Sequence, residues 1–482
     1  MAITFAVART TPRGVDAVGV PVASDGAVPR AIGLGRATLS SLGFDGKVGQ
    51  TLVLPQASGP VVIAVGVGER AKVTASVLRS ASAALARAGQ KRATIATSLA
   101  DADGINARDA AQAVAEGFTL ASYRFTMLKT DKTAPAIATV TLTSAPGRLA
   151  SLDAGAQRGA AIADAVCVAR DMANTPPAHL TARMMADQAV EIAKVSGLDV
   201  TVLDEHAMAE LGLGGLLGVN RGSTEPPRLV KLSYTPRGGG KGHVGLVGKG
   251  VMFDSGGLSL KPSDSMITMK MDMTGAAVVL ATMSLLKTLK VKAKVTAWLC
   301  CTDNRTGGDA MAVGDVLTMR NGKTVEVQNT DAEGRLILAD GLSLAIEDKV
   351  DAVLDIATLT GAAMGALGLR YAALLSNNDL LAGQVLAAAG RADENLWRLP
   401  IVPEYRKLLD SNVADMRNIG GPYGGAITAS LFLQEFVSGT PWAHLDIAGP
   451  MSSDTDDGWL TRGASAYGVR TFVELLESFE PV

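Results

Sequence analysis

Four carboxylates and three basic side chains are concentrated in two short stretches of this sequence. The first stretch, GKGVMFDSGGLSLKP, runs from Gly248 to Pro262 and continues as MKMDM at Met269–Met273, and the second is NTDAEGR at Asn329–Arg335. Isolated charges are costly to bury, and this cluster leaves an excess negative charge that divalent cations would balance. The two stretches therefore predict the halves of one metal site, formed by Lys249, Asp254, Lys261, Asp272, Asp331, Glu333 and Arg335.

The composition of the cluster indicates which cations it would hold. Carboxylates without a nearby histidine favour Mn²⁺, Mg²⁺ or Zn²⁺, and four carboxylates with Lys249 are too many ligands for one tetrahedral centre. Two adjacent cations fit better, because in two-metal hydrolases ions about 3.5–4 Å apart share carboxylates and a bridging water whose pKa falls toward neutrality. A lysine that ligates a metal must be neutral, so its pKa must be strongly lowered.

Each charged residue also has an ordinary structural explanation. Asp331 and Glu333 alone would be acids at a helix N-terminus, and Lys249 and Lys261 would be solvated or paired lysines. Asp272 stands between two methionines just before an Ala-Ala sequence, which predicts a buried carboxylate. The joint occurrence of these residues, more than any one of them, favours the metal site.

Other catalytic arrangements have weaker support. The four histidines, at positions 179, 206, 243 and 444, are scattered and form no HExxH motif, so ordinary structural roles are the favoured interpretation. A serine nucleophile would have to be Ser255 or Ser259, and neither lies in a GxSxG sequence.

The predicted elements place the charged residues at one edge of a sheet. The apolar run Val244–Val247 predicts a buried parallel strand, with Lys249 closing it and Asp254 in a turn beyond its carboxyl end. Helices are predicted over Thr274–Thr288, just after Asp272, and over Leu336–Ala345, just after Glu333. Further strands are expected at Val200–Leu203, Arg228–Tyr234, Val295–Cys301, Ala352–Ala357, Ala372–Leu375 and Ala443–Ile447.

Two connections in this region have turn sequences. Asn321-Gly322 predicts a two-residue hairpin between Val316–Arg320 and Lys323–Val327. The glycine-rich Thr235–His243 (TPRGGGKGH) predicts a flexible, hairpin-like turn. Thr181 is expected to cap a helix over Arg183–Ser196.

The N-terminal part of the chain has a βαβ pattern. Strands are predicted at Val61–Val65, Thr94–Thr97 and Ile137–Thr143, and helices at Thr74–Ala88 and Asp109–Ala121. Gly66 and Gly68 follow the first of these strands, but the third glycine of a dinucleotide-binding fingerprint is replaced by Ala71, so an ordinary strand-to-helix turn is favoured.

Length and composition predict the overall class. With 482 residues, two domains are expected: an α/β domain over 1–152, a linking helix over 153–173, and a larger domain over 174–482 with a mostly parallel sheet flanked by helices.

The net charge of −2 gives no overall positive charge that would attract nucleic acid or anionic lipid. Cys300 and Cys301 are adjacent, which suits reduced thiols. Without a secretory or membrane-spanning pattern, a cytoplasmic protein is expected.

Several motifs resemble those of the leucyl aminopeptidases, the cytosol aminopeptidase family of dinuclear metallopeptidases. The signature NTDAEGRL is unbroken at Asn329–Leu336, and the resemblance continues in LLGVNRGSTEPPRL, VGKGVMFDSGGLSLKP, MKMDMTGAA, ATLTGA, WRLP and WAHLDIAG. It covers nearly the whole second domain, whereas the first domain is similar only in its α/β organisation. The resemblance implies a metal-dependent aminopeptidase that releases N-terminal residues, preferring Leu and other apolar side chains.

The resemblance also implies roles for individual residues. Lys249, Asp254, Asp272 and Glu333 would hold one metal, and Asp254, Asp331 and Glu333 the other, as Mn²⁺ or Zn²⁺. Lys261 would stabilise the oxyanion, and Arg335 would hold a bicarbonate that relays a proton. The neutral α-amine of the substrate would ligate a metal, so only peptides with a free N-terminus are expected to react.

The substrate pocket is implied in the same way. Met269, Thr358, Gly361, Ala448 and Met451 would line the pocket for the first side chain, and Leu359 would contact the substrate backbone. Core packing is the alternative explanation for each of them.

One stretch departs from the family pattern. Asn304 is expected to contact substrate, but it lies in Asp303-Asn304-Arg305 where the family has Glu-Asn-Met, and Ala312–Asp315 replaces an Arg-Pro-Gly-Asp loop.

The resemblance implies a homohexamer of two stacked trimers and leaves two rival functions. Some family members bind DNA, so a DNA-binding regulator is one alternative, although the near-neutral charge makes nucleic acid an unexpected partner. A Cys-Gly dipeptidase is the other, and it would differ in substrate ranking rather than in motifs.

Overall fold

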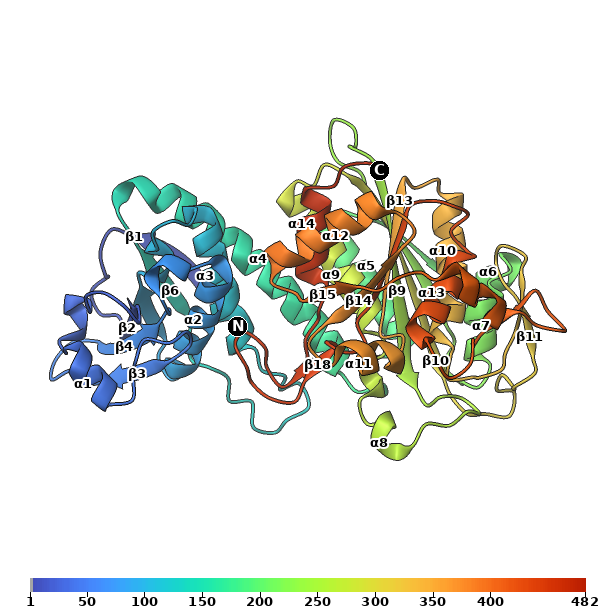
Figure 1. The fold of residues 1–482 in the computed structure, drawn as a ribbon, viewed down its shortest axis with the longest axis horizontal. Helices are drawn as coiled ribbons and strands as arrows, with labels where there is room; N and C mark the ends of the chain where they lie inside the picture. Colours follow the sequence, from blue (N-terminus) through green and yellow to red (C-terminus); the bar gives the residue numbers. More distant parts are fainter. Residues whose placement is uncertain (1–2) are drawn as a thin grey trace. The chain divides into compact units, whose positions relative to one another are not determined.

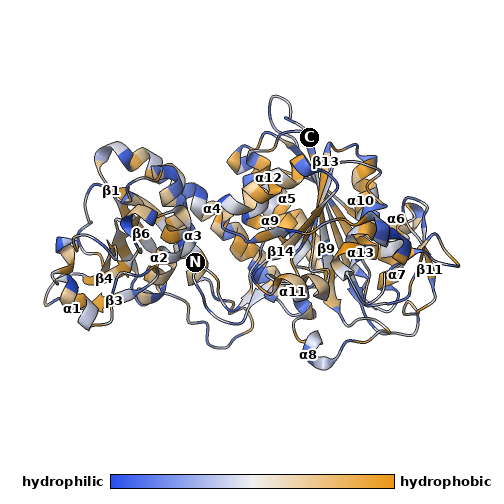
Figure 2. Ribbon diagram, in the orientation of Figure 1, coloured by the Kyte–Doolittle hydropathy of each residue, from blue (hydrophilic) through white to orange (hydrophobic). Residues whose placement is uncertain are grey.

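The computed structural model describes residues 3–482, and the chain divides into two units with separate cores (Figure 1). The first unit holds the described residues through Cys167 together with Ser453–Gly463, and the second holds Val168–Ser452 with Ala464–Val482. The helix α4 (Leu149–Asn174) runs from one unit into the other. Figure 2 shows apolar residues gathered in the strands and inner helices and polar residues in the connecting loops.

The first unit is built on a six-stranded sheet in the order β1-β6-β5-β2-β4-β3. All neighbouring strands are parallel except β3 and β4. The strands are β1 (Thr4–Ala8), β2 (Ala17–Val22), β3 (Thr51–Leu54), β4 (Val61–Gly66), β5 (Thr94–Thr97) and β6 (Thr139–Thr143).

Two helices of the first unit pack against each other and bury their alanine-rich faces in one core. They are α2 (Ala75–Ala88) and α3 (Ala107–Ser122), and Thr74 caps α2 by accepting a hydrogen bond from the Val77 backbone. A smaller apolar cluster includes Leu39 of α1 (Arg36–Ser41) and Ile32 of η1 (Arg30–Ile32). The short helices η2 (Arg70–Lys72), η3 (Leu99–Asp101) and η4 (Pro146–Arg148) complete the unit.

The second unit contains an eight-stranded sheet in the order β15-β14-β17-β13-β9-β10-β8-β7. Its centre, from β17 to β10, is parallel, and antiparallel pairs occur only toward the two edges. The strands are β7 (Asp199–Leu203), β8 (Arg228–Tyr234), β9 (His243–Asp254), β10 (Lys294–Asn304), β13 (Ala352–Ala357), β14 (Ala372–Ser376), β15 (Leu396–Arg398) and β17 (Trp442–Asp446).

Helices cover both faces of this sheet (Figure 1). One layer contains α5 (Ala182–Ser196), α9 (Thr274–Leu289), α12 (Asp379–Ala392) and α14 (Val469–Glu477), and the other contains α7 (Gly214–Asn220), α10 (Gly334–Glu347) and α13 (Gly425–Gln434). The remaining helices are α6 (Glu205–Glu210), α8 (Ser263–Met266), η5 (Met269–Met271), α11 (Gly361–Leu367) and η6 (Pro403–Leu409). Two α/β domains, the larger with a mostly parallel sheet flanked by helices, are therefore confirmed.

The predicted hairpin is present, but the prediction of a two-residue turn is wrong: the Met319 backbone donates to the Lys323 carbonyl, which leaves the three residues 320–322 in the turn. β11 (Val316–Thr318) and β12 (Thr324–Glu326) pair antiparallel, and Gly322 has a φ of 87° in the turn. β12 also pairs with β16 (Met416–Arg417), and the short strands β18 (Ser452–Ser453) and β19 (Gly463–Ala464) lie near the end of the chain.

The prediction that Lys249 and Asp254 lie beyond a strand is wrong. β9 continues through both residues and ends at Asp254. Glycines in the predicted turn permit this, because a Cβ at Gly248 would lie 2.7 Å from the Ala276 Cα on α9. The glycines therefore serve close strand-to-helix packing, and Lys249 projects from the strand interior.

The interpretation of Thr235–His243 as a hairpin-like turn is wrong as well. The strands it joins, β8 and β9, do not pair with each other; each pairs with β10. The glycines of this segment indicate a loop but not which strands the loop connects, because glycine-rich loops occur in crossover connections as well as in hairpins.

One segment, Ser263–Leu289, is long and apolar enough by composition to span a membrane. However, 83% of its most apolar window is buried inside the protein, as in a core helix. Most of it is α9, which packs on β9 and β10.

Candidate metal centre and substrate cavity

Lys249 is held by three oxygen atoms at the centre of the second unit. Its Nζ lies 2.9 Å from Asp272 Oδ2 and 2.9 Å from Glu333 Oε1, and it donates to the Thr358 carbonyl at 2.8 Å. Gly334 makes room for it, since a Cβ at that position would lie 2.7 Å from the lysine Nζ. The strand β9 thus delivers a buried lysine into the carboxylate cluster.

Asp272 lies between η5 and α9 and is oriented by Thr358. The Thr358 hydroxyl donates to Asp272 Oδ1 at 2.7 Å, which leaves Oδ2 for Lys249. Thr358 follows β13, so the carboxyl end of a neighbouring parallel strand fixes this carboxylate. This is the sheet edge where open α/β folds bind ligands.

Thr330 joins the two charged stretches. Its hydroxyl donates to the Gly256 carbonyl at 2.6 Å and accepts from the Ser259 backbone at 2.7 Å. Its carbonyl accepts from Asn304 Nδ2 at 3.0 Å. A buried threonine in the NTDAEGR sequence therefore fastens it to the DSGGLS turn.

Lys261 connects the carboxylates on the other side of the cluster. Its Nζ lies 2.9 Å from Asp254 Oδ2 and 2.5 Å from Asp331 Oδ1. Asp254 Oδ1 accepts from Asn304 Nδ2 and from the Gly256 backbone, both at 2.8 Å. Asn304 thus lies behind Asp254 and is not among the residues that line the cavity.

The carboxylates form a compact, buried set that fits a cation site. Ligand oxygens of Asp254, Asp272 and Glu333 all lie within 4.8 Å of one another. Asp272 Oδ2, Glu333 Oε1 and Asp331 Oδ1 are buried; each contacts a lysine ammonium but accepts no well-directed hydrogen bond from the described residues. Buried oxygens without hydrogen bonds are costly unless another positive group binds them.

The electrostatics of the cluster are those of crowded acids. Burial and the neighbouring charge of Asp254 raise the pKa of Glu333 to about 7, although Lys249 opposes the shift. Burial likewise raises the pKa of Asp272 well above its usual range and raises the pKa of Asp331. Burial alone would lower the pKa of Lys249, but the carboxylates outweigh it and raise that pKa, so coordination to a metal would require loss of this proton.

Arg335 lines the same cavity and carries one unsatisfied donor. Its Nη1 donates to the Asn418 carbonyl at 2.8 Å, whereas its buried Nε has no partner among the described residues. Burial lowers the pKa of the guanidinium to about 10, so it remains charged at neutral pH. A buried cation with a free N–H is suited to an anion.

A cavity of about 680 Å³ opens above the carboxylates. The structure brings thirteen of the fourteen predicted site residues together, all except Asn304. The metal-site, basic and pocket residues that line this cavity are Lys249, Asp254, Lys261, Met269, Asp272, Asp331, Glu333, Arg335, Thr358, Leu359, Gly361, Ala448 and Met451.

Asp446 organises the loop that forms one wall. Its Oδ1 accepts from the backbone N–H groups of Leu359, Thr360 and Ala448, and its Oδ2 accepts from the Thr360 hydroxyl at 2.6 Å. This carboxylate lies at the end of β17 and fixes the backbone of predicted pocket residues.

Sequence reasoning did not identify Thr330, Asn418 or Asp446. Asn418 accepts from the Gln328 and Asn329 backbones and donates to the Asn329 and Ala332 carbonyls. Asn418 lies far along the chain in an ordinary loop sequence, so no local signal could have found it. Thr330 and Asp446 lie inside motifs that had been recognised, NTDAEGR and WAHLDIAG.

A compact, buried carboxylate cluster beneath a cavity, at the carboxyl edge of an α/β sheet, defines a protein that binds divalent cations. The comparisons identify the class further. The model of the cytosol aminopeptidase family, catalytic domain, matches residues 167–473, and the model of its N-terminal domain matches residues 23–132.

Individual relatives agree along nearly the full chain. A probable cytosol aminopeptidase of Alkaliphilus oremlandii is 40% identical, with 92% of this chain and 90% of that protein covered. One of Rhodococcus opacus is 42% identical, with 98% and 96% covered. Our chain belongs to the cytosol aminopeptidase family and is a metal-dependent aminopeptidase, as the sequence motifs predicted.

Solved structures show the same fold. The bottromycin maturation enzyme BotP in complex with Mn has a TM-score of 0.89 and 41% identity, covering 96% of this chain and 99% of that one. A mutant of tomato leucine aminopeptidase has a TM-score of 0.89 and 32% identity, covering 98% and 96%. Both similarities extend over the two units.

Proposed function

We propose that this aminopeptidase releases N-terminal leucine and other apolar residues from peptides, using a water shared between two divalent cations. The observation that carries the proposal is the placement of buried carboxylates, Lys261 and Arg335 around one cavity. The cavity size supports it, because pockets for small ligands are roughly 300–1,000 Å³.

The residues that would hold the cations follow from the cluster. One cation would contact Lys249, Asp254, Asp272 and Glu333, and the other Asp254, Asp331 and Glu333. When bound, such cations supply Lewis-acid activation of a water and of the scissile carbonyl. We favour Mn²⁺ over Zn²⁺, because the similar BotP structure is described as a complex with Mn.

Lys261 and Arg335 are proposed to act on substrate atoms. Lys261 Nζ faces the cavity from between Asp254 and Asp331, where an ammonium group offsets negative charge on the carbonyl oxygen during attack. Arg335 offers its free Nε to an anion, and bicarbonate is the anion we propose, acting as a proton relay.

The side-chain pocket is proposed to prefer apolar residues without strict selection. Met269, Met451 and Ala448 give it apolar walls, and methionines adapt their shape readily. An extra methylene in such a pocket changes binding by only about 1–3 kcal/mol. Leucine and methionine should therefore react best, with other aliphatic residues following.

A homohexamer in the cytoplasm is proposed for the assembled enzyme. The names of the relatives support the location. Exposed apolar side chains of the second unit, including Leu369, Trp397 and Tyr423, support burial by other subunits. Sedimentation of the native protein as a monomer would contradict the hexamer.

The direct test is hydrolysis of leucine anilide by the full chain with Mn²⁺, followed by chelation and add-back. Asp254→Ala, Lys261→Ala and Glu333→Ala should each abolish activity, whereas the matched control Asp264→Ala, at an exposed carboxylate, should not. Activity that survives chelation or the Asp254 change would refute the proposal.

The requirement for a free amine has its own test. N-acetyl-leucine anilide should not be hydrolysed, because acetylation removes the basic nitrogen that the cluster is proposed to receive. Cleavage at a rate comparable to that of leucine anilide would show that the substrate N-terminus is not recognised here.

The bicarbonate role is tested separately. Arg335→Lys keeps the charge but removes the Nε donor, so we expect a slower reaction with unchanged metal content. If the wild-type rate is the same in bicarbonate-depleted buffer and in added bicarbonate, the relay is contradicted.

A further inference from the structure

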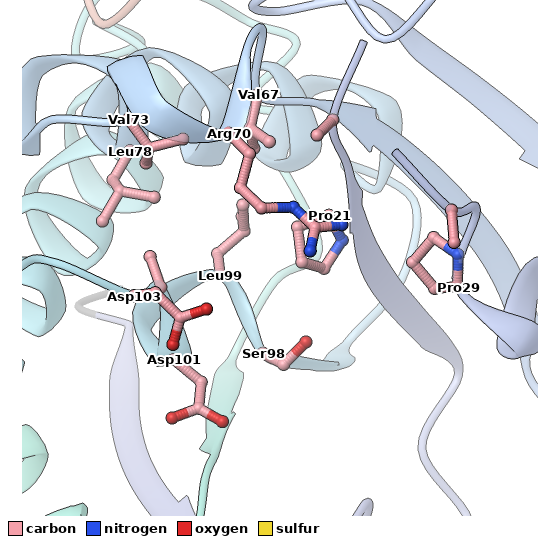
Figure 3. Close-up of a pocket in the computed structure, with 13 residues that line it drawn as sticks. Pro21, Pro29, Val67, Arg70, Val73, Leu78, Ser98, Leu99, Asp101 and Asp103 are labelled. Atoms are coloured by element: carbon pink, nitrogen blue, oxygen red, sulfur yellow. The ribbon is translucent and has the colours of Figure 1, made fainter. Parts of the chain in front are cut away.

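A second cavity, of about 200 Å³, lies within the first unit (Figure 3). Its walls are apolar and include Pro21, Val67, Leu78 and Leu99. Its polar lining comes from Arg70, Ser98, Asp101 and Asp103. None of these residues belongs to the carboxylate cluster described above.

The cavity lies where the strand order of the sheet reverses, at the carboxyl ends of its parallel strands. The parallel strands lie in the spatial order β4-β2-β5-β6. Following the chain, β4 pairs with one side of β2, and the next parallel strand, β5, pairs with the other side of β2. Pro21 is near the end of β2, Val67 follows β4, and Ser98 follows β5. Ligands of open α/β sheets bind at the carboxyl edge where the strand order reverses in this way.

The glycines next to this cavity do not form a phosphate cradle. A Cβ at Gly66 would lie 2.0 Å from the Lys47 carbonyl, and Gly68 donates to the Gly46 carbonyl at 2.8 Å. Gly66 is therefore required for packing against residues 46–47, and Gly68 is favoured by its φ of 73° and by Val48 Cγ2, which would lie 2.9 Å from a Cβ there. The feature that the turn contributes to the cavity is the side chain of Arg70.

The charged groups of the rim have opposite signs. Figure 3 shows the Arg70 guanidinium on one side and the carboxylates of Asp101 and Asp103 on the other. Asp101 accepts from the Ser144 hydroxyl at 2.5 Å and from Arg148 at 3.0 Å. Within residues 3–482, the side chains of Arg70 and Asp103 make no ion pair or hydrogen bond to protein groups; the Asp25 carboxylate attracts the Arg70 guanidinium without pairing with it, so both side chains remain available to a ligand.

We propose that this cavity binds a free apolar α-amino acid. The ligand carboxylate would pair with Arg70, its ammonium group with Asp103, and its side chain would occupy the space between Pro21, Leu78 and Leu99. A zwitterion matches a rim with one cation opposite carboxylates, whereas a polyanion such as a nucleotide would face two acids with one arginine. The volume accommodates roughly seven waters at about 30 Å³ each, which suits one amino acid.

The site would give the N-terminal domain a role related to the reaction. A free apolar amino acid is the product class of the proposed function, and only this link, not the binding, rests on that proposal. Binding at the first unit needs no metal, so it can be measured whether or not the protein is active.

The test is equilibrium dialysis of radiolabelled L-leucine against the full chain, with Mn²⁺ and, separately, with chelator. Arg70→Gln and Asp103→Asn remove one rim charge each, and Arg13→Ala removes an exposed arginine of the same unit outside the cavity as a matched control. Circular dichroism checks that each variant is folded. Competition with leucinamide, N-acetyl-leucine, glycine, inorganic phosphate and adenosine diphosphate identifies the groups recognised.

We expect leucine binding to be saturable and independent of chelator, and to persist in Arg13→Ala. In Arg70→Gln and in Asp103→Asn it should weaken about tenfold or more, because each variant loses one charge-assisted contact. Leucinamide should compete equally well in wild type and Arg70→Gln, and N-acetyl-leucine equally well in wild type and Asp103→Asn. Leucine binding that is absent with chelator, or unchanged in both rim variants, would overturn the proposal. So would tighter binding of phosphate or adenosine diphosphate than of leucine.

Discussion

Asn418 is the residue whose substitution most sharply separates positioning of the metal site from general stability. It is fully buried and touches neither the carboxylates nor the lysines through its side chain. Its Nδ2 donates to the Asn329 carbonyl at 2.7 Å and its Oδ1 accepts from the Gln328 backbone at 2.9 Å, with longer bonds at 3.3 and 3.4 Å. The loop that carries Asp331 and Glu333 therefore depends on this amide.

The effect of Asn418→Ala follows from these bonds. Each well-formed hydrogen bond contributes about 1 kcal/mol, and each buried backbone group left unpaired costs about 1–3 kcal/mol, so we expect a loss of about 2–4 kcal/mol in the free energy of unfolding. Groups that orient metal ligands typically change metal affinity by about 10–100-fold. Both losses should appear together in this variant.

The assay combines urea unfolding with calorimetric titration of Mn²⁺. Asn377→Ala is the matched control, because Asn377 also bridges backbone groups, donating to Thr440 at 3.0 Å and accepting from Trp442 at 2.8 Å, away from the site. Because Asn377 is exposed, the control should lose a smaller part of its stability and keep its metal affinity. If Asn418→Ala keeps its metal affinity within about twofold of wild type, the positioning argument is refuted.

Further predictions concern close packing, pH and metal removal. Gly334→Ala would place a Cβ 2.7 Å from Lys249 Nζ, so we expect metal affinity, measured by dialysis, to fall at least about tenfold in a folded protein; unchanged affinity would refute this. Burial alone would lower the pKa of His444, but the Asp355 carboxylate 2.5 Å away outweighs burial and raises this pKa above 6.5. The stability that the pair contributes should therefore be present below pH about 6.5 and be lost as the pH rises through the folded-state pKa. Urea midpoints that fall no faster with rising pH in wild type than in His444→Asn would contradict that assignment. Chelation should lower Tm reversibly, since metal at 100 times its Kd stabilises by about 2.7 kcal/mol, and a Tm insensitive to Mn²⁺ would contradict metal binding by the folded state.

The metal cluster could be predicted from sequence because its residues lie in two local motifs. Lys249, Asp254 and Asp272 fall within residues 248–273, and Asp331 and Glu333 fall within residues 329–335. The strand and helix patterns around them are also local, so β13 and β8 were predicted with the bounds that the structure shows. Placement at a common sheet edge then followed from parallel topology.

The supporting contacts could not be predicted because they join distant parts of the chain. Asn418 reaches residues about 90 positions away, and Asp446 reaches Leu359 and Thr360. The extension of β9 through Lys249 was missed for a related reason. Glycines at 248 and 250 resemble a turn signal, and only the approach of α9 shows that they serve packing.

The first unit shows the same limit. The sequence pattern revealed its βαβ units but not β1 and β2, which precede the recognised repeat. It also gave no indication that residues 453–463 return to this unit. There Arg87 donates to the Leu460 carbonyl at 2.6 Å, a contact across 373 positions.

The central claim is that the buried carboxylates form a dinuclear metal centre. Anomalous diffraction from crystals of the full chain grown with Mn²⁺ tests it most directly. We predict two adjacent anomalous peaks, one within reach of Lys249, Asp254, Asp272 and Glu333 and one within reach of Asp254, Asp331 and Glu333. A single peak, or none, among these residues in Mn²⁺-saturated crystals would contradict the account.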